Sequence, residues 1–68
     1  MEIKRFRESQ KMTQDDLALK IGVSRSTVAM WEKGENSPRV EVLIKLSDLF
    51  GCTIDELVRG GTKDVANK

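Results

Sequence analysis

Residues 14–34 read QDDLALKIGVSRSTVAMWEKG, and this stretch decides the fold. It contains two short segments with helical spacing of apolar residues, separated by Gly22 and ended by Gly34. In the second segment, Val28 and Trp31 form an apolar edge, whereas the opposite edge is polar. A helix of this kind anchors one side to a core and leaves the other side free for a partner.

The ends of these two helices are marked by capping residues. Thr13 is a good N-cap for the first helix, and Asp16 three residues later forms a short-armed version of the capping box. Ser24 is an N-cap for the second helix, and Gly22 supplies the left-handed conformation that ends the first. The apolar edge expected to be buried on the first helix consists of Leu17, Ala18 and Ile21.

The flanking sequence predicts three more helices. One covers about residues 2–10, another about residues 39–50, and a short one follows Thr53, which forms a full capping box with Glu56. The side chains expected to pack inward from the first two of these are Ile3, Phe6, Val40, Leu43, Leu46, Leu49 and Phe50. Five short helices with tight connections predict a compact all-α fold.

The composition narrows the class of protein. The 68 residues suffice for one small domain, which we place at residues 1–59, with a flexible tail at residues 60–68. One cysteine and no histidine give no basis for a disulfide, a metal site or another cofactor, and no catalytic group has an activator, so we expect no enzyme. The free thiol and the lack of an apolar run of about 18 residues favour a cytoplasmic protein without membrane contact.

The segment FRESQKMTQDDLALKIGVSRSTVAMWEKGENSP, residues 6–38, closely resembles the helix-turn-helix family of the phage Cro and lambda-type repressors, also called the xenobiotic response element family. The matching positions are Thr13–Gln14, Leu17–Ala18, Ile21–Gly22–Val23, Ser24, Val28, Trp31–Glu32–Lys33–Gly34 and Pro38. The resemblance extends over about residues 3–58. It implies a five-helix, lambda-repressor-like domain whose second and third helices form the helix-turn-helix, in a nucleoid-associated regulator of transcription.

The resemblance further implies that the outer edge of the third helix contacts base edges in the major groove of double-stranded DNA. Arg25 is the main candidate for specificity, because its planar guanidinium suits O6 and N7 of guanine. The complete set of expected base-contacting residues is Ser24, Arg25, Ser26 and Met30.

Phosphate contacts are expected around the same helix. Gln14 lies at a helix N-terminus, where backbone N–H groups favour an anion, and Arg39 matches a position that grips the DNA backbone in relatives. The expected phosphate contacts are Gln14, Thr27, Lys33, Asn36 and Arg39. The residues expected to support the recognition helix are Arg7, Ala18, Gly22, Val28, Trp31 and Glu32. By the family pattern Arg7 pairs with Glu32, and such a bond contributes under ~1 kcal/mol if it is exposed.

The sequence thus predicts a sequence-specific, DNA-binding transcriptional regulator, and more narrowly a repressor. One recognition helix reads only a few base pairs, so we expect a homodimer on an inverted-repeat operator, with Ile54 and Val58 as candidate dimer contacts. An alternative is an antitoxin or another module that binds a protein partner and regulates its own operon. Co-purification with a partner protein would distinguish the two.

Overall fold

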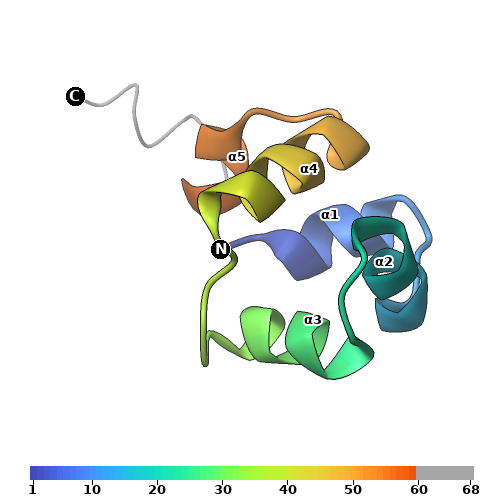
Figure 1. The fold of residues 1–68 in the computed structure, drawn as a ribbon. Helices are drawn as coiled ribbons and strands as arrows, with labels where there is room; N and C mark the ends of the chain where they lie inside the picture. Colours follow the sequence, from blue (N-terminus) through green and yellow to red (C-terminus); the bar gives the residue numbers. More distant parts are fainter. Residues whose placement is uncertain (60–68) are drawn as a thin grey trace.

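The computed structural model describes residues 1–59, so the flexible tail predicted for residues 60–68 lies outside the described residues. The described chain forms the helices α1 (Ile3–Ser9), α2 (Gln14–Ile21), α3 (Arg25–Lys33), α4 (Val40–Phe50) and α5 (Ile54–Arg59), shown in Figure 1. Residues 1–59 contain no strand. The all-α prediction is confirmed, and the predicted helix boundaries agree with the observed ones to within about one residue.

Both predicted capping boxes are present. The Thr13 hydroxyl accepts a hydrogen bond of 3.0 Å from the Asp16 backbone N–H, and the Asp16 carboxylate accepts one of 2.9 Å from the Thr13 N–H. Thr53 and Glu56 form the same reciprocal pair at 3.0 and 2.9 Å. These bonds satisfy N–H groups that a helix start leaves without partners, so they fix where α2 and α5 begin.

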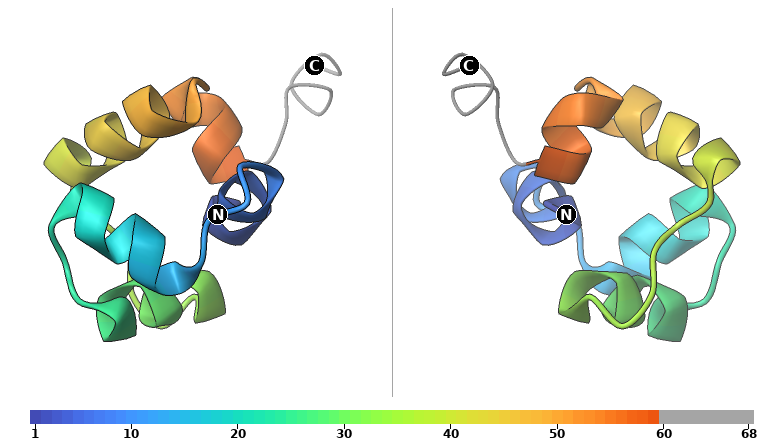
Figure 2. Two further views of the ribbon diagram at one scale, coloured as in Figure 1. Left: turned by 90° about the vertical axis from the view of Figure 1, so that its right-hand side faces the viewer. Right: turned by 90° about the vertical axis from the view of Figure 1, so that its left-hand side faces the viewer.

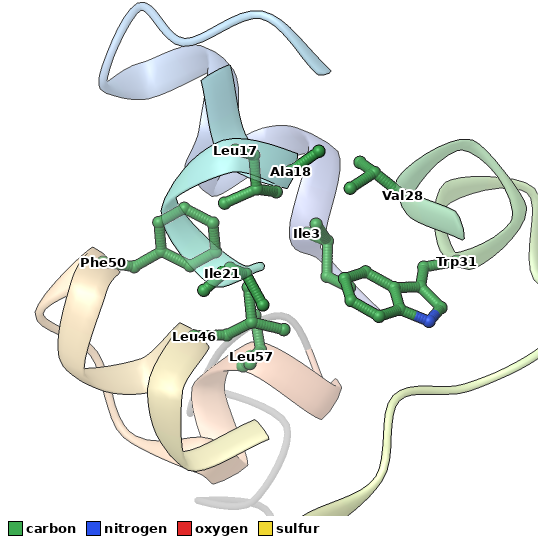
Figure 3. Close-up of a cluster of buried hydrophobic side chains, with 9 residues drawn as sticks. All are labelled: Ile3, Leu17, Ala18, Ile21, Val28, Trp31, Leu46, Phe50 and Leu57. Carbon is green, nitrogen blue, oxygen red and sulfur yellow. The ribbon is translucent and has the colours of Figure 1, made fainter. Parts of the chain in front are cut away.

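A single apolar core receives side chains from all five helices. Figure 3 shows Val28 and Trp31 extending from α3 toward Ala18 and Ile3, which belong to α2 and α1. The buried cluster consists of Ile3, Leu17, Ala18, Ile21, Val28, Trp31, Leu46, Phe50 and Leu57. Full burial of an aliphatic side chain contributes about 1.5–3 kcal/mol, so these few residues supply most of the driving force for folding.

The helices are arranged with α3 on one side of the domain and α4 and α5 on the other. Figures 1 and 2 show α1 and α2 between these two sides. The backbone N–H of Glu2 donates to the carbonyl of Leu57 at 2.8 Å, which ties the start of the chain to α5. Among the helices of residues 1–59, none lies over the outer side of α3 in Figure 2.

The prediction that Val40 packs in the core is wrong. Val40 is 67% exposed, whereas Leu46 and Phe50 on the same helix are buried and Leu43 and Leu49 are half-buried. Val40 lies about 120° around the helix from Leu46, because successive residues of an α-helix advance by about 100°. It is also the first residue of α4.

The turn after α1 contains a residue other than glycine with a positive φ, which the sequence does not predict. Lys11 has φ 60°, in the left-handed region that a β-carbon disfavours by about 1–2 kcal/mol. Its N–H donates to the carbonyl of Glu8 at 2.9 Å, so the strained turn is held by a hydrogen bond.

We predict that Lys11→Gly raises the free energy of unfolding by about 0.5–1 kcal/mol. Glycine removes the β-carbon strain, and its greater entropy in the unfolded chain offsets part of the gain. Urea unfolding followed by circular dichroism measures the change. Lys20→Gly is the matched control, because Lys20 is exposed within α2 and glycine there should cost about 1 kcal/mol. A loss of stability in Lys11→Gly would contradict the prediction.

Candidate nucleic-acid interface

The turn between α2 and α3 sets how the two helices cross. Gly22 has φ 90°, and its N–H and that of Val23 both donate to the Ala18 carbonyl, at 2.8 and 3.0 Å. Ala18 itself is buried where the two helices meet, close to Val28 in Figure 3. A small side chain at this point lets the helices approach closely, so the turn and Ala18 together fix the orientation of α3.

The first turn of α3 is capped by Ser24, and its first two side chains are exposed. The Ser24 hydroxyl accepts the Thr27 N–H at 3.1 Å and lies 2.9 Å from the Thr27 Oγ1. Ser24, Arg25 and Ser26 are all exposed, and Thr27 is half-buried. The structure therefore places three of the predicted base-contacting residues together on a free edge, while Ser24 already uses its hydroxyl as the helix cap.

The fourth predicted base-contacting residue differs from the other three. Met30 is half-buried, and its sulfur accepts a contact of 3.9 Å from the side-chain amide of Asn36. Asn36 belongs to the segment after α3, so this contact links the loop to the recognition helix. Met30 therefore lies at the margin of the free edge of α3.

The predicted phosphate-contacting residues fall into separate groups. An open hollow of about 340 Å³ lies between α3 and the start of α4, and its lining residues are Thr27, Trp31, Asn36, Ser37, Pro38, Arg39 and Val42. Three of the predicted phosphate contacts (Thr27, Asn36 and Arg39) therefore surround one hollow. Lys33 is exposed at the end of α3, and Gln14 is half-buried at the start of α2.

Arg7, Glu32 and Gln14 form a buried network that connects the first three helices. Arg7 Nε and Nη2 donate to the two carboxylate oxygens of Glu32 at 2.7 and 3.2 Å, and Gln14 Nε2 donates to Glu32 at 3.0 Å. Arg7 Nη1 donates to the carbonyl of Met12 at 2.7 Å. The two charged side chains are only 9% and 6% exposed. The pair that the family pattern implies is present, and it is buried rather than a surface bond.

The ionisation of this network follows from burial and hydrogen bonding. Burial alone would raise the pKa of Glu32, but the hydrogen bonds from Arg7 and Gln14 outweigh it, so the pKa of Glu32 lies below its ordinary value of 4.5. The hydrogen bond to Glu32 raises the pKa of Arg7, against the opposing effect of burial. Both groups are therefore charged at neutral pH, and the negative charge of α3 is fully paired.

Two contacts at this surface were not predicted from the sequence. Gln14, expected at a phosphate, already donates one amide hydrogen to Glu32, which leaves its second amide hydrogen for another acceptor. Arg25 forms an ion pair with Asp15 of α2 at 3.7 Å. In the sequence, the position of Asp15 next to Gln14 at the start of α2 is the only indication of the ion pair with Arg25.

These features define the class of protein as an all-helical domain built on a helix-turn-helix with a free recognition edge. The profile of the helix-turn-helix family matches residues 3–57. The chain belongs to this family, whose members are DNA-binding regulators of transcription, and the resemblance to Cro and lambda-type repressors is confirmed.

Curated relatives include regulators from archaea, bacteria and phage. A regulator from Methanocaldococcus jannaschii, named as an uncharacterised HTH-type transcriptional regulator, is 38% identical over 81% of this chain and 83% of its own length. The transcriptional repressor RstR of the cryptic phage CTXphi from Vibrio cholerae is 33% identical over 97% of this chain and 60% of its own. The transcriptional activator BcrR of Enterococcus faecalis is 38% identical over 85% of this chain and 28% of its own.

The chain thus spans most of the archaeal relative but under two thirds of RstR and of BcrR. No solved structure shows a significant match to the chain. Within residues 1–59, none of the helices is both long enough and apolar enough to span a membrane.

We predict that Arg7→Met lowers the free energy of unfolding by about 3 kcal/mol, because it leaves the Glu32 carboxylate buried without its partner. The double variant Arg7→Met/Glu32→Leu should recover most of that loss, since two apolar side chains replace the ion pair. Urea unfolding of the two variants and the parent at pH 7 measures both effects. Equal losses in the single and double variants would contradict the prediction.

The same pair makes stability depend on acid. Because folding lowers the pKa of Glu32, the unfolded chain binds more protons between the folded pKa and 4.5. The contribution of Glu32 is therefore present above pH 4.5 and is lost as the pH falls through the folded pKa. Unfolding free energies measured between pH 3 and pH 6 should decline less steeply in the double variant, in which only the other carboxylates titrate.

Proposed function

We propose that residues 1–59 form a sequence-specific domain that binds double-stranded DNA and represses transcription. The observation that carries this proposal is the two-sided character of α3. Val28 and Trp31 are buried on one side, whereas Arg25 and Ser26 are exposed on the other. A helix held in this way can enter the major groove without losing its contacts to the core.

Arg25 is the principal reader of bases in this proposal. It is the first residue of α3, its side chain is 62% exposed, and its guanidinium can donate two parallel hydrogen bonds to O6 and N7 of guanine. Ser26 adds a hydroxyl that can donate or accept, and Met30 offers an apolar contact to a thymine methyl. Ser24 contributes less to reading because its hydroxyl caps the helix.

Around α3, phosphates are bound by groups that do not distinguish one base from another. Gln14 presents its free amide hydrogen at the start of α2, beside the backbone N–H groups of the first turn. Thr27, Asn36 and Arg39 converge on the hollow between α3 and α4, and Lys33 is exposed at the end of α3. These contacts fix the register of α3 in the groove.

In this proposal the unit that binds DNA is a homodimer. Ile54 and Val58 are one turn apart on α5 and are 39% and 41% exposed, and Val40 and Ile44 form a similar exposed pair on α4. Both helices lie on the side of the domain away from α3. A two-fold axis near α5 would present two recognition helices to successive major grooves, about 34 Å apart.

The relatives include two named repressors as well as the activator BcrR, and we favour repression. RstR aligns with 97% of this chain and is named a repressor. The C2 protein of phage P22 is also named a repressor. The simplest mechanism for a domain of this kind is occupancy, because a bound dimer excludes RNA polymerase from an overlapping promoter.

We predict that selection of bound duplexes from a random pool yields an inverted repeat with a guanine in each half-site. Arg25→Ala should relax the preference at that guanine and cost about 1–3 kcal/mol per contact. Arg39→Ala is the matched comparison: it should weaken binding to all sequences alike and reduce the slope of affinity against salt. An unchanged consensus in Arg25→Ala would remove Arg25 as a base-reading residue.

We also predict that Ile54→Glu/Val58→Glu shifts the chain toward monomer and weakens operator binding at low protein concentration. The two carboxylates introduced on each copy of α5 would have to be desolvated before the copies could pack together. Sedimentation equilibrium and operator titrations measure the two effects. Leu19→Glu is the control for sedimentation, because Leu19 is 82% exposed on α2, outside the proposed interface. A monomeric parent chain at high micromolar concentration would count against the dimer.

A further inference from the structure

We infer that Asp15 is a positioning residue that sets how sharply Arg25 discriminates guanine from other bases. This inference rests on the proposed function, because it takes Arg25 as the base-reading residue. The observation behind it is the ion pair across the helix-turn-helix, in which Arg25 Nε lies 3.7 Å from Asp15 Oδ1. Arg25 is the first residue of α3 and Asp15 the second residue of α2.

The atoms involved leave the reading edge of Arg25 free. A guanidinium has a side edge that includes Nε and an end edge formed by the two terminal nitrogens. Asp15 engages the side edge through Nε. The end edge, which carries the parallel donors that match O6 and N7 of guanine, remains available. An arginine held at its side edge keeps fewer rotamers, so less conformational entropy is lost when the end edge meets a base.

The backbones on both sides of the pair are fixed. The capping box of Thr13 and Asp16 holds the first turn of α2, and it uses the carboxylate of Asp16, so Asp15 is not needed as a cap. The Ser24 cap holds the first turn of α3. The fold therefore fixes the separation of the two backbone positions, while each side chain is well exposed, at 62% for Arg25 and 73% for Asp15.

Electrostatics gives Asp15 a second effect at the same place. The first turn of α3 contains no acidic residue and begins with a cation, an unfavourable arrangement at the positive end of a helix dipole. Asp15, which belongs to α2, supplies the negative charge that the first turn of α3 lacks. The same charge repels phosphates, so it lowers the affinity for every duplex. Asp15 should thus reduce binding to unrelated DNA while increasing discrimination at the base that Arg25 reads.

The test compares two variants that remove one exposed carboxylate each. Asp15→Ala removes the partner of Arg25. Glu35→Ala removes an exposed carboxylate just beyond α3 that forms no ion pair within residues 1–59. Affinities are measured by fluorescence anisotropy for the selected operator and for the same duplex with the guanine of each half-site replaced by adenine. A third duplex of unrelated sequence reports background binding.

Both variants should bind the unrelated duplex more tightly than the parent chain. Only Asp15→Ala should lose discrimination between the guanine and adenine duplexes, by about two- to fivefold per half-site, the range expected for an exposed ion pair. In an Arg25→Ala background, Asp15→Ala should change the affinities for both duplexes by the same factor. Unchanged or improved discrimination in Asp15→Ala overturns the inference, since Asp15 would then only repel DNA or compete for Arg25.

The failure of this inference is distinguishable from failure of the proposed function. If the parent chain prefers guanine through Arg25 but Asp15→Ala keeps the full preference, only the role of Asp15 is lost. If the parent chain binds all duplexes equally, sequence-specific reading fails and the role of Asp15 fails with it.

Discussion

The buried ion pair between Arg7 and Glu32 is the constraint on which the recognition surface depends. Removing two charges from water costs several kcal/mol each, and only good geometry with further hydrogen bonds offsets that cost. Here Arg7 also binds the Met12 carbonyl, and Glu32 also accepts from Gln14. The network therefore links α1, α2 and α3 through directional hydrogen bonds. Apolar contacts alone would allow the helices to slide more easily, because they have no preferred direction.

That constraint reaches the proposed DNA-binding side of the domain through Gln14 and through α3 itself. Glu32 lies on the last turn of α3, and the Ser24 cap fixes the first turn, so both ends of the recognition helix are held. Between them, Val28 and Trp31 occupy the core. The exposed residues Arg25 and Ser26 lie outside these contacts. Their side chains can therefore vary at little cost in stability, so related domains can keep the fold and differ in the bases that they contact.

The parts of the structure that were predictable from the sequence are those governed by local chemistry. The caps at Thr13 and Ser24 and the left-handed Gly22 follow from neighbouring residues, and apolar spacing gave the core side chains of α2 and α3. The burial of Arg7 and the exposure of Val40 depend on which helices lie nearby, which no local pattern encodes. The family resemblance supplied the partner of Arg7, but not its burial. The contact of Asp15 with Arg25 depends on the crossing of two helices and on side-chain rotamers, so it required coordinates.

The charge distribution explains how such a domain can bind DNA with a net charge of only +1. Asp15 lies beside Arg25 of the proposed reading edge, and two further exposed acidic residues are Asp16 at the start of α2 and Glu35 just beyond α3. They weaken the general attraction to phosphates, which is the same for every sequence. Contacts that depend on the base are weakened less, because they are short and directional. A nearly neutral DNA-binding domain therefore has a lower total affinity but a larger ratio of specific to unspecific binding, and in the proposed homodimer the doubled number of specific contacts would offset the lost affinity.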